Sequence, residues 1–146
     1  MSYSKIKSYA KLNLALNIIG KKNSLHKIES IITFVNLHDE ILIKKINLKK
    51  HIKIFSGKFS KNIGKNNTIF ELLRILEEKK ILNNQKFKIK VKKRIPNKAG
   101  LGGGSMNAAS VLKFLIKKKI INVTKKEIPE ISRLVGSDVI LGIKPV

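Results

Sequence analysis

Apolar and polar residues alternate over several stretches of the chain, with the period of two that is typical of β-strands with one buried face. Over residues 6–18 this alternation predicts a strand with one face formed by Leu12, Leu14, Leu16 and Ile18. The opposite face then carries Lys11, Asn13, Ala15 and Asn17. Lys11 and Asn13 are therefore expected to point in the same direction, roughly 7 Å apart along the strand. Further strands are predicted at 27–36, 39–46, 52–55 and 86–93, with a turn at 20–24 and a loop at 56–66.

Three other stretches repeat their apolar residues with a period near 3.6, which predicts helices. The first covers residues 68–81, and Asn67 is placed to cap its N-terminus with a side-chain oxygen. The others lie near 105–119 and 125–135. Thr124, with Glu127 three residues later, has the spacing of a capping box at the start of the last helix.

Length and composition narrow the class of protein. A chain of 146 residues is long enough for one domain with a hydrophobic core, and the mixture of elements predicts an α+β fold of layered sheet and helices over residues 1–146. The absence of cysteine excludes a disulfide scaffold and a thiolate metal site. No signal or membrane-spanning segment is recognised, so a cytoplasmic protein with no membrane partner is expected.

The formal net charge of +23 comes from 32 lysines and arginines against 9 acidic residues. Only Arg74, Arg94 and Arg133 are arginines. Nucleic-acid sites favour the bidentate geometry of arginine and aromatic residues for stacking. The lysine excess is therefore interpreted as a general drift of composition, and no specific nucleic acid is expected. A basic nucleic-acid-binding module without catalysis is kept as the alternative function.

Residues 94–109 carry the strongest chemical signal. Four glycines, Gly100, Gly102, Gly103 and Gly104, separate the predicted strand from a helix expected to begin near Ser105. Glycine leaves backbone amides open to a ligand, and a helix N-terminus favours anions, so a phosphate-binding loop is predicted. The loop has neither the Gly-Lys-Ser/Thr of a Walker A motif nor the later acidic residue of a dinucleotide fingerprint. A glycine hinge without a ligand is the alternative interpretation.

The run Pro96-x-x-Ala99-Gly-Leu-Gly-Gly-Gly-Ser105-x-Asn107-Ala-Ala resembles the ATP-binding loop of the GHMP kinases. Other motifs agree with the family in order and spacing: Ala10-Lys-Leu-Asn-Leu14, the turn from Gly20 to His26, Asn67-Thr-Ile-Phe70 and Gly136-Ser-Asp-Val139. The extra glycine and the Asn-Ala-Ala ending are similar to one branch of this family. That branch phosphorylates the 2-hydroxyl of 4-diphosphocytidyl-2-C-methyl-D-erythritol in the non-mevalonate isoprenoid pathway.

The resemblance implies a ribosomal protein S5 domain 2-like fold and a kinase that uses ATP and Mg²⁺. It implies that Asp138 is the catalytic base and that Lys11 stabilises charge beside it. Asn13 and His26 are implied as contacts to the cytidine end of the small-molecule substrate, and no residue is assigned to the metal. The implied ATP contacts are Pro96, Asn97, Lys98, Ala99, Gly100, Leu101, Gly102, Gly103, Gly104, Ser105 and Met106.

The chain departs from the family pattern close to this chemistry. Leu25 stands where an aromatic residue precedes the histidine, and Met106 replaces a serine of the loop. Lys98 replaces a glycine, which is tolerated if the residue has a negative φ. Kinases of the family also have a C-terminal domain, so this chain is expected to be the N-terminal domain alone. Self-association or a missing C-terminal half is its implied partner, and loss of activity through truncation is one expectation.

Overall fold

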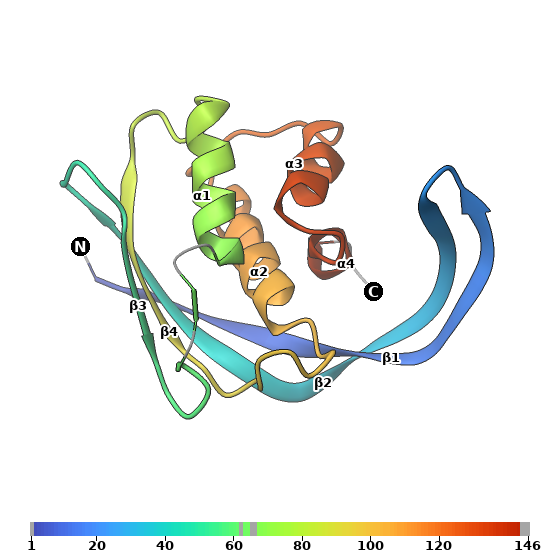
Figure 1. Ribbon diagram of the computed structural model, residues 1–146. Coiled ribbons are helices and arrows are strands. Elements are labelled where there is room, and N and C mark those ends of the chain that lie inside the picture. The colour runs from blue at the N-terminus through green and yellow to red at the C-terminus, as the bar shows by residue number, and fades with distance from the viewer. Residues whose placement is uncertain (1, 62, 65–66, 144–146) are drawn as a thin grey trace.

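The computed structural model describes residues 2–61, 63–64 and 67–143, and in this part all helices lie on one face of a four-stranded sheet (Figure 1). The strands are Ser4–Lys22 (β1), Leu25–Ile46 (β2), Ile52–Ser56 (β3) and Lys86–Lys92 (β4). The helices are Thr68–Glu78 (α1), Gly103–Lys117 (α2), Glu127–Val135 (α3) and Val139–Ile143 (α4). The sheet order is β1-β2-β4-β3, with β3 and β4 parallel and the other neighbours antiparallel. The predicted α+β class is confirmed.

The hydrophobic core lies between the sheet and the helices. Phe87, Ile89 and Val91 of β4 are buried, and the lysines that alternate with them lie on the other face of the strand. Ile43 and Ile41 of β2 pair with Ile89 and Val91, so they share the buried face. The helices close this face with apolar side chains, which in α1 are Ile69, Leu72, Leu73, Ile75 and Leu76. The helical spacing that predicted α1 is the spacing of these buried residues.

β1 and β2 are much longer than the other strands, and their outer halves leave the sheet as a curved two-stranded ribbon (Figure 1). The sequence predicted two strands on either side of Leu37 and His38, which is wrong, because β2 continues through both residues. The pairing shifts here instead: Tyr9 pairs with His38, whereas Ala10 pairs with Val35. A bulge absorbs extra residues and bends a strand without ending it. Polar residues at this point therefore marked a bend and not a turn.

Two further register shifts interrupt the alternation that was predicted along β1. They lie between Asn13 and Ala15 and between Ile18 and Gly20. In this outer part the apolar side chains of the ribbon are largely exposed, with Leu14 at 62% and Ile18 at 63%. The apolar run of β1 therefore contributes little to the core of the described residues.

The helix ends follow capping groups, some of which the sequence revealed. The Asn67 side chain accepts a hydrogen bond from the Phe70 N–H at 3.1 Å, which confirms it as the N-cap of α1. Thr124 and Glu127 also form the two hydrogen bonds expected of a capping box, although α3 begins at Glu127 with Lys126 as its N-cap: the Glu127 N–H donates to the Thr124 hydroxyl at 3.3 Å, and the Thr124 N–H donates to the Glu127 carboxylate at 2.7 Å. Both predictions hold because a cap is a local bond between residues close in sequence.

Other helix limits differ from the prediction because they depend on backbone conformation. α1 ends at Glu78 and not at residue 81, since Lys80 has a φ of +58° that no α-helix can accommodate. α2 begins at Gly103, before the expected Ser105, because Gly102 acts as the N-cap with a φ of +64°. The short α4 was not predicted. Among the helices described, none is both long and apolar enough to cross a membrane.

Candidate functional site

The glycine loop lies between β4 and α2 and crosses the middle of β1. The Lys11 N–H donates a hydrogen bond to the Leu101 carbonyl at 3.0 Å, which ties the loop to the strand. At Gly102 a Cβ atom would lie 2.8 Å from the Cγ of Lys11. Together with its positive φ, this close approach leaves glycine as the residue that fits. The loop therefore rests directly on the Lys11 side chain.

A cavity of about 250 Å³ lies inside the loop. Ten of the eleven residues implied as ATP contacts, Pro96 to Ser105, line it together with Thr68 and Lys93. The Thr68 hydroxyl donates to the Gly104 carbonyl at 2.6 Å, so the first residue of α1 is fastened to the start of α2. Backbone amides at a helix N-terminus, glycines and a lysine side chain make this cavity suitable for a phosphate chain.

Met106 does not line this cavity, in contrast to the other residues implied as ATP contacts. Its side chain is buried, and its sulfur lies 3.1 Å from where a Cβ on Gly142 of α4 would be. The side chain of this position therefore belongs to the packing between α2 and α4. The departure at Met106 therefore lies outside the lining of the loop cavity.

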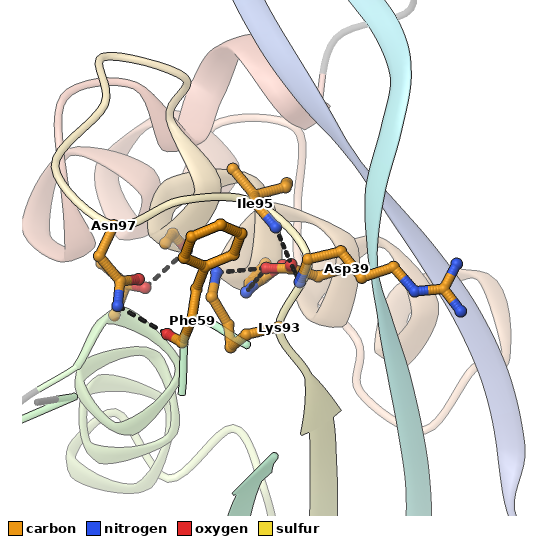
Figure 2. A network of polar contacts seen from close by, with 9 residues as sticks. Asp39, Phe59, Lys93, Ile95 and Asn97 are labelled. Atoms are coloured by element: carbon orange, nitrogen blue, oxygen red, sulfur yellow. Dashed lines mark hydrogen bonds and ion pairs between the residues drawn. The ribbon is translucent and has the colours of Figure 1, made fainter. Parts of the chain in front are cut away.

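Lys98 has a φ of +57°, so the condition of a negative φ under which lysine is tolerated is not met. An L-residue in the left-handed region costs about 1–2 kcal/mol relative to its usual conformations. The neighbouring Asn97 fixes this side of the loop, because its amide donates to the Phe59 carbonyl at 2.7 Å (Figure 2). The turn after β3 thus supports a loop that contains a strained lysine.

Lys11 and Asp138 meet at the edge of the loop, although they come from the two ends of the chain. The Lys11 ammonium lies 3.0 Å from the Asp138 carboxylate, and it donates to the Asn13 side-chain oxygen at 3.1 Å. The contact between Lys11 and Asn13 confirms that both side chains point the same way. The Lys11 side chain is 7% exposed and that of Asp138 is 36% exposed. The lysine is therefore fixed in place, whereas the carboxylate can be reached from solvent.

His26 lies apart from these residues. It pairs with Lys21 near the far end of the ribbon, whereas Lys11 pairs with Phe34 near the sheet. Among the residues that the structure describes, no hydrogen bond or ion pair joins His26 to Lys11, Asn13 or Asp138. Of the implied substrate contacts, Asn13 is therefore part of the cluster and His26 is not.

Asp39 is a site residue that the sequence analysis missed. It is fully buried where β2, β4 and α2 meet, and its carboxylate is the centre of a polar network (Figure 2). One oxygen accepts from the Arg94 and Ile95 N–H groups at 2.7 and 2.9 Å. The other pairs with the Lys93 ammonium and accepts from the Asn107 amide at 2.9 Å. A signal was present, because Asp39 alternates with Ile41 and Ile43, and a carboxylate on a core face needs partners.

A second cavity of about 260 Å³ adjoins the first and shares Thr68, Lys93, Asn97 and Gly104 with it. Its remaining lining is apolar from Phe55, Ile63 and Ile69, and polar from Asn67 and Asn107. Within the described part of the chain, the side-chain oxygen of Asn107 is buried and has no hydrogen-bond partner. A mixed apolar and polar lining of this kind is typical of small-molecule sites. In the same part of the chain, no three histidine or acidic residues form a group that could hold a metal ion.

Comparison with known proteins agrees with this geometry. The model of the "GHMP kinases N terminal domain" family matches residues 67–144. A 4-diphosphocytidyl-2-C-methyl-D-erythritol kinase from Pelagibacter ubique is 62% identical over 99% of this chain and 52% of its own length. The corresponding kinase from Thermoanaerobacter pseudethanolicus is 35% identical over 95% of this chain and 47% of its own length. The chain thus spans about half the length of the curated relatives it matches.

Solved structures give the same fold. A crystal structure of 4-(cytidine 5'-diphospho)-2C-methyl-D-erythritol kinase matches 96% of this chain and 48% of its own, with a TM-score of 0.74 and 25% identity. A mevalonate kinase matches 95% of this chain with a TM-score of 0.60 and 17% identity, a likeness of fold alone. The sequence motifs, the matching family model and the fold of the solved structures therefore agree with one another.

Proposed function

Since the chain belongs to the GHMP kinases, we propose that it binds ATP and transfers the terminal phosphoryl group to the 2-hydroxyl of 4-diphosphocytidyl-2-C-methyl-D-erythritol. The observation that carries the proposal is the meeting of Lys11 and Asp138 at the edge of the glycine loop. The substrate is proposed from the names of the relatives at 62% and 35% identity. This reaction would place the protein in isoprenoid synthesis, in the cytoplasm.

The two adjoining cavities support an orientation for ATP. The glycine loop would hold the phosphates through its N–H groups and the start of α2, with Lys93 supplying positive charge. The adjoining cavity would take the base between the apolar side chains of Phe55, Ile63 and Ile69. Magnesium, held mainly by phosphates and water, would neutralise charge on the phosphates.

In this arrangement Asp138 would accept the proton of the attacking hydroxyl, since its carboxylate is partly exposed beside the loop. Lys11 would hold Asp138 in place and stabilise the negative charge that spreads over the transferring phosphoryl group. Asn13 keeps the Lys11 ammonium oriented through its own hydrogen bond. Asn13 and, along the ribbon, His26 are proposed to contact the cytidine end of the substrate.

We assign residues 1–146 to the ATP-binding half of such a kinase. The curated relatives extend well beyond the matched region. Further polypeptide, in the same chain or in a second copy, is therefore proposed to complete the substrate side of the cleft. A basic nucleic-acid-binding module is the weaker function, since charge alone explains neither the Lys11–Asp138 pair nor the loop packed on Lys11.

The test is ADP release with ATP, magnesium and 4-diphosphocytidyl-2-C-methyl-D-erythritol. We expect release that requires the alcohol and disappears in Lys11→Ala. Asp138→Asn should lower turnover by about 10²–10⁴-fold, the usual contribution of a positioned base, with nucleotide affinity nearly unchanged. Glu130→Gln, which removes an exposed carboxylate of α3 that pairs with Lys79, is the matched control and should keep full activity. Alcohol-dependent release that persists in Asp138→Asn would exclude Asp138 as the base.

A further inference from the structure

We propose that Asp39 is a positioning residue for the nucleotide, which clamps the two ends of the glycine loop together and holds Lys93 against them. This inference rests on the proposed binding of ATP. Asp39 is fully buried and lines neither of the two cavities, so it does not touch a ligand there. Its action must therefore pass through the groups that it binds.

The first of these groups form the upstream end of the loop. β4 ends at Lys92, and the Lys93 N–H still donates to the Ser56 carbonyl of β3 at 2.7 Å, so the backbone that leaves the sheet begins at Arg94. One Asp39 oxygen accepts the N–H groups of both Arg94 and Ile95, at 2.7 and 2.9 Å. The direction in which the chain enters the loop at Pro96 is thus set by a single carboxylate oxygen.

The second oxygen holds the downstream end. It accepts from the amide of Asn107, which lies in the second turn of α2 and is itself buried. Because both oxygens belong to one rigid group, the entry of the loop and the helix that follows it are kept at a fixed separation. A cradle whose ends are fixed before the ligand arrives loses less conformational entropy on binding.

The same oxygen pairs with the Lys93 ammonium, whose side chain is buried and lines both cavities. A Cβ on Gly103 would lie 3.3 Å from that nitrogen, so the ammonium is next to the first turn of α2. Without Asp39 the buried ammonium of Lys93 would have no counterion at this position and would move. Asp39 therefore also decides where positive charge lies beside the proposed phosphate site.

The four donors use the acceptor capacity of the carboxylate, which is about four lone-pair sites. An Asp39→Asn variant keeps one oxygen for the two backbone N–H groups but turns an NH₂ toward Lys93 and Asn107. We expect the affinity for MgADP, measured by calorimetry on the 146-residue chain, to fall about tenfold or more, as for other residues that orient binding groups from behind.

The exchange variant Asp39→Asn with Asn107→Asp tests the clamp itself. It returns a carboxylate to the pair, which can accept from the new amide and from Lys93, so MgADP affinity should recover to within about threefold. If Asp39→Asn alone does not fold, Asn107→Asp is measured in its place. This variant also breaks the contact, because it sets two carboxylates against each other. Weak binding there, with recovery in the exchange variant, would support the clamp.

Leu76→Ala is the matched control for lost stability, since Leu76 is fully buried in α1 and lines neither cavity. It should lower the unfolding temperature and leave MgADP affinity unchanged where the protein is folded. Equal affinity of the unaltered chain and a folded Asp39→Asn, or no recovery in the exchange variant, would overturn the role of Asp39 alone. No MgADP binding by the unaltered chain would overturn the proposed function as well.

Discussion

Lys98, Gly100 and Gly102 all have positive φ, but each meets a different environment. A Cβ on Gly100 would have open space around it, whereas one on Gly102 would collide with Lys11. Lys98 already carries the side chain that the other two lack. Substitutions at the three positions therefore separate the cost of backbone strain from the cost of moving Lys11, the proposed catalytic lysine.

Gly100→Ala should lose about 1–2 kcal/mol of stability, because it forces an L-residue into the left-handed region, and Gly102→Ala should lose more, because it adds a collision with Lys11 to the same strain. Only Gly102→Ala should also impair the proposed reaction, since its methyl group would lie 2.8 Å from the Cγ of Lys11. A displacement of about 1 Å at a reacting group can cost about 10²-fold in turnover. Chemical denaturation and steady-state kinetics of the pair measure the two effects separately. Equal turnover in both variants would argue against a catalytic Lys11.

Lys98→Gly is expected to stabilise the protein by about 0.5–1 kcal/mol. Release from the left-handed region gains about 1–2 kcal/mol, and the greater freedom of glycine in the unfolded chain costs about 0.5–1 kcal/mol. Lys98→Ala removes the charge but keeps the Cβ, so it should change stability little. Urea unfolding of the three proteins measures the difference. If glycine and alanine prove equal at this position, the loop does not store strain at residue 98.

At the scale of elements, His51 joins three segments of the fold. It lies just before β3, accepts the Phe87 N–H of β4 on Nδ1 at 3.0 Å, and places Nε2 3.1 Å from the Glu77 carboxylate of α1. Because Nδ1 accepts, the hydrogen of the neutral ring is on Nε2 and points to Glu77. Burial lowers the pKa of His51 below 6.5, and Lys86 and Lys53 add to this effect against the opposing charge of Glu77.

Because the pKa of His51 is lowered in the folded protein, its contribution to stability depends on pH. Below about pH 6.5 the unfolded chain binds a proton on His51 that the folded protein does not, so the free energy of unfolding decreases on acidification. Glu77 adds to the loss at lower pH: burial raises its pKa, but Lys86 and His51 outweigh this and hold it below 4.5. His51→Asn, whose oxygen can still accept the Phe87 N–H, should lose less stability between pH 7.5 and 5.5. Urea unfolding of both proteins at each pH measures this difference. Equal changes in the free energy of unfolding between pH 7.5 and 5.5 would contradict the expectation.

The sequence predicted those elements whose signals are local. Asn67 and the Thr124–Glu127 box were recognised because each cap joins residues three apart. The continuous β2 was not, since its bulge opposite Tyr9 is a property of the pairing between two strands. α1 and α2 were placed correctly by their apolar spacing, but their ends depend on left-handed residues at Lys80 and Gly102.

In the candidate site, too, features that are local in sequence could be predicted and features that depend on distant segments could not. The glycine loop and its position before a helix could be predicted, because they are continuous in sequence. The roles of Lys11 and Asp138 came from a resemblance, and periodicity alone gave only the shared direction of Lys11 and Asn13. Asp39 was missed because its partners lie in other segments, so its function exists only in the folded chain. The positive φ of Lys98 was missed because no pattern of residues in the sequence indicates it.

At the scale of the whole molecule, the helices and loop form one body, from which the ribbon of β1 and β2 extends (Figure 1). The net charge of +23 attracts anions of every kind, so binding of ATP must be distinguished from general anion binding. Ligands that bind only the folded state raise the unfolding temperature by mass action. This effect reports on the entire domain and needs no turnover.

MgADP at a hundredfold excess over its dissociation constant adds about 2.7 kcal/mol of stability, which in a domain of this size should raise the unfolding temperature by about 5–10 °C. Sulfate at equal ionic strength should produce a much smaller shift, since it occupies the loop cavity without filling its neighbour. Gly103→Val should abolish the response to MgADP, because a Cβ there lies 3.0 Å from Ile95 and 3.3 Å from the Lys93 ammonium. Differential scanning calorimetry at physiological salt measures all three. Equal shifts from sulfate and MgADP would mean that the loop binds anions without selecting a nucleotide.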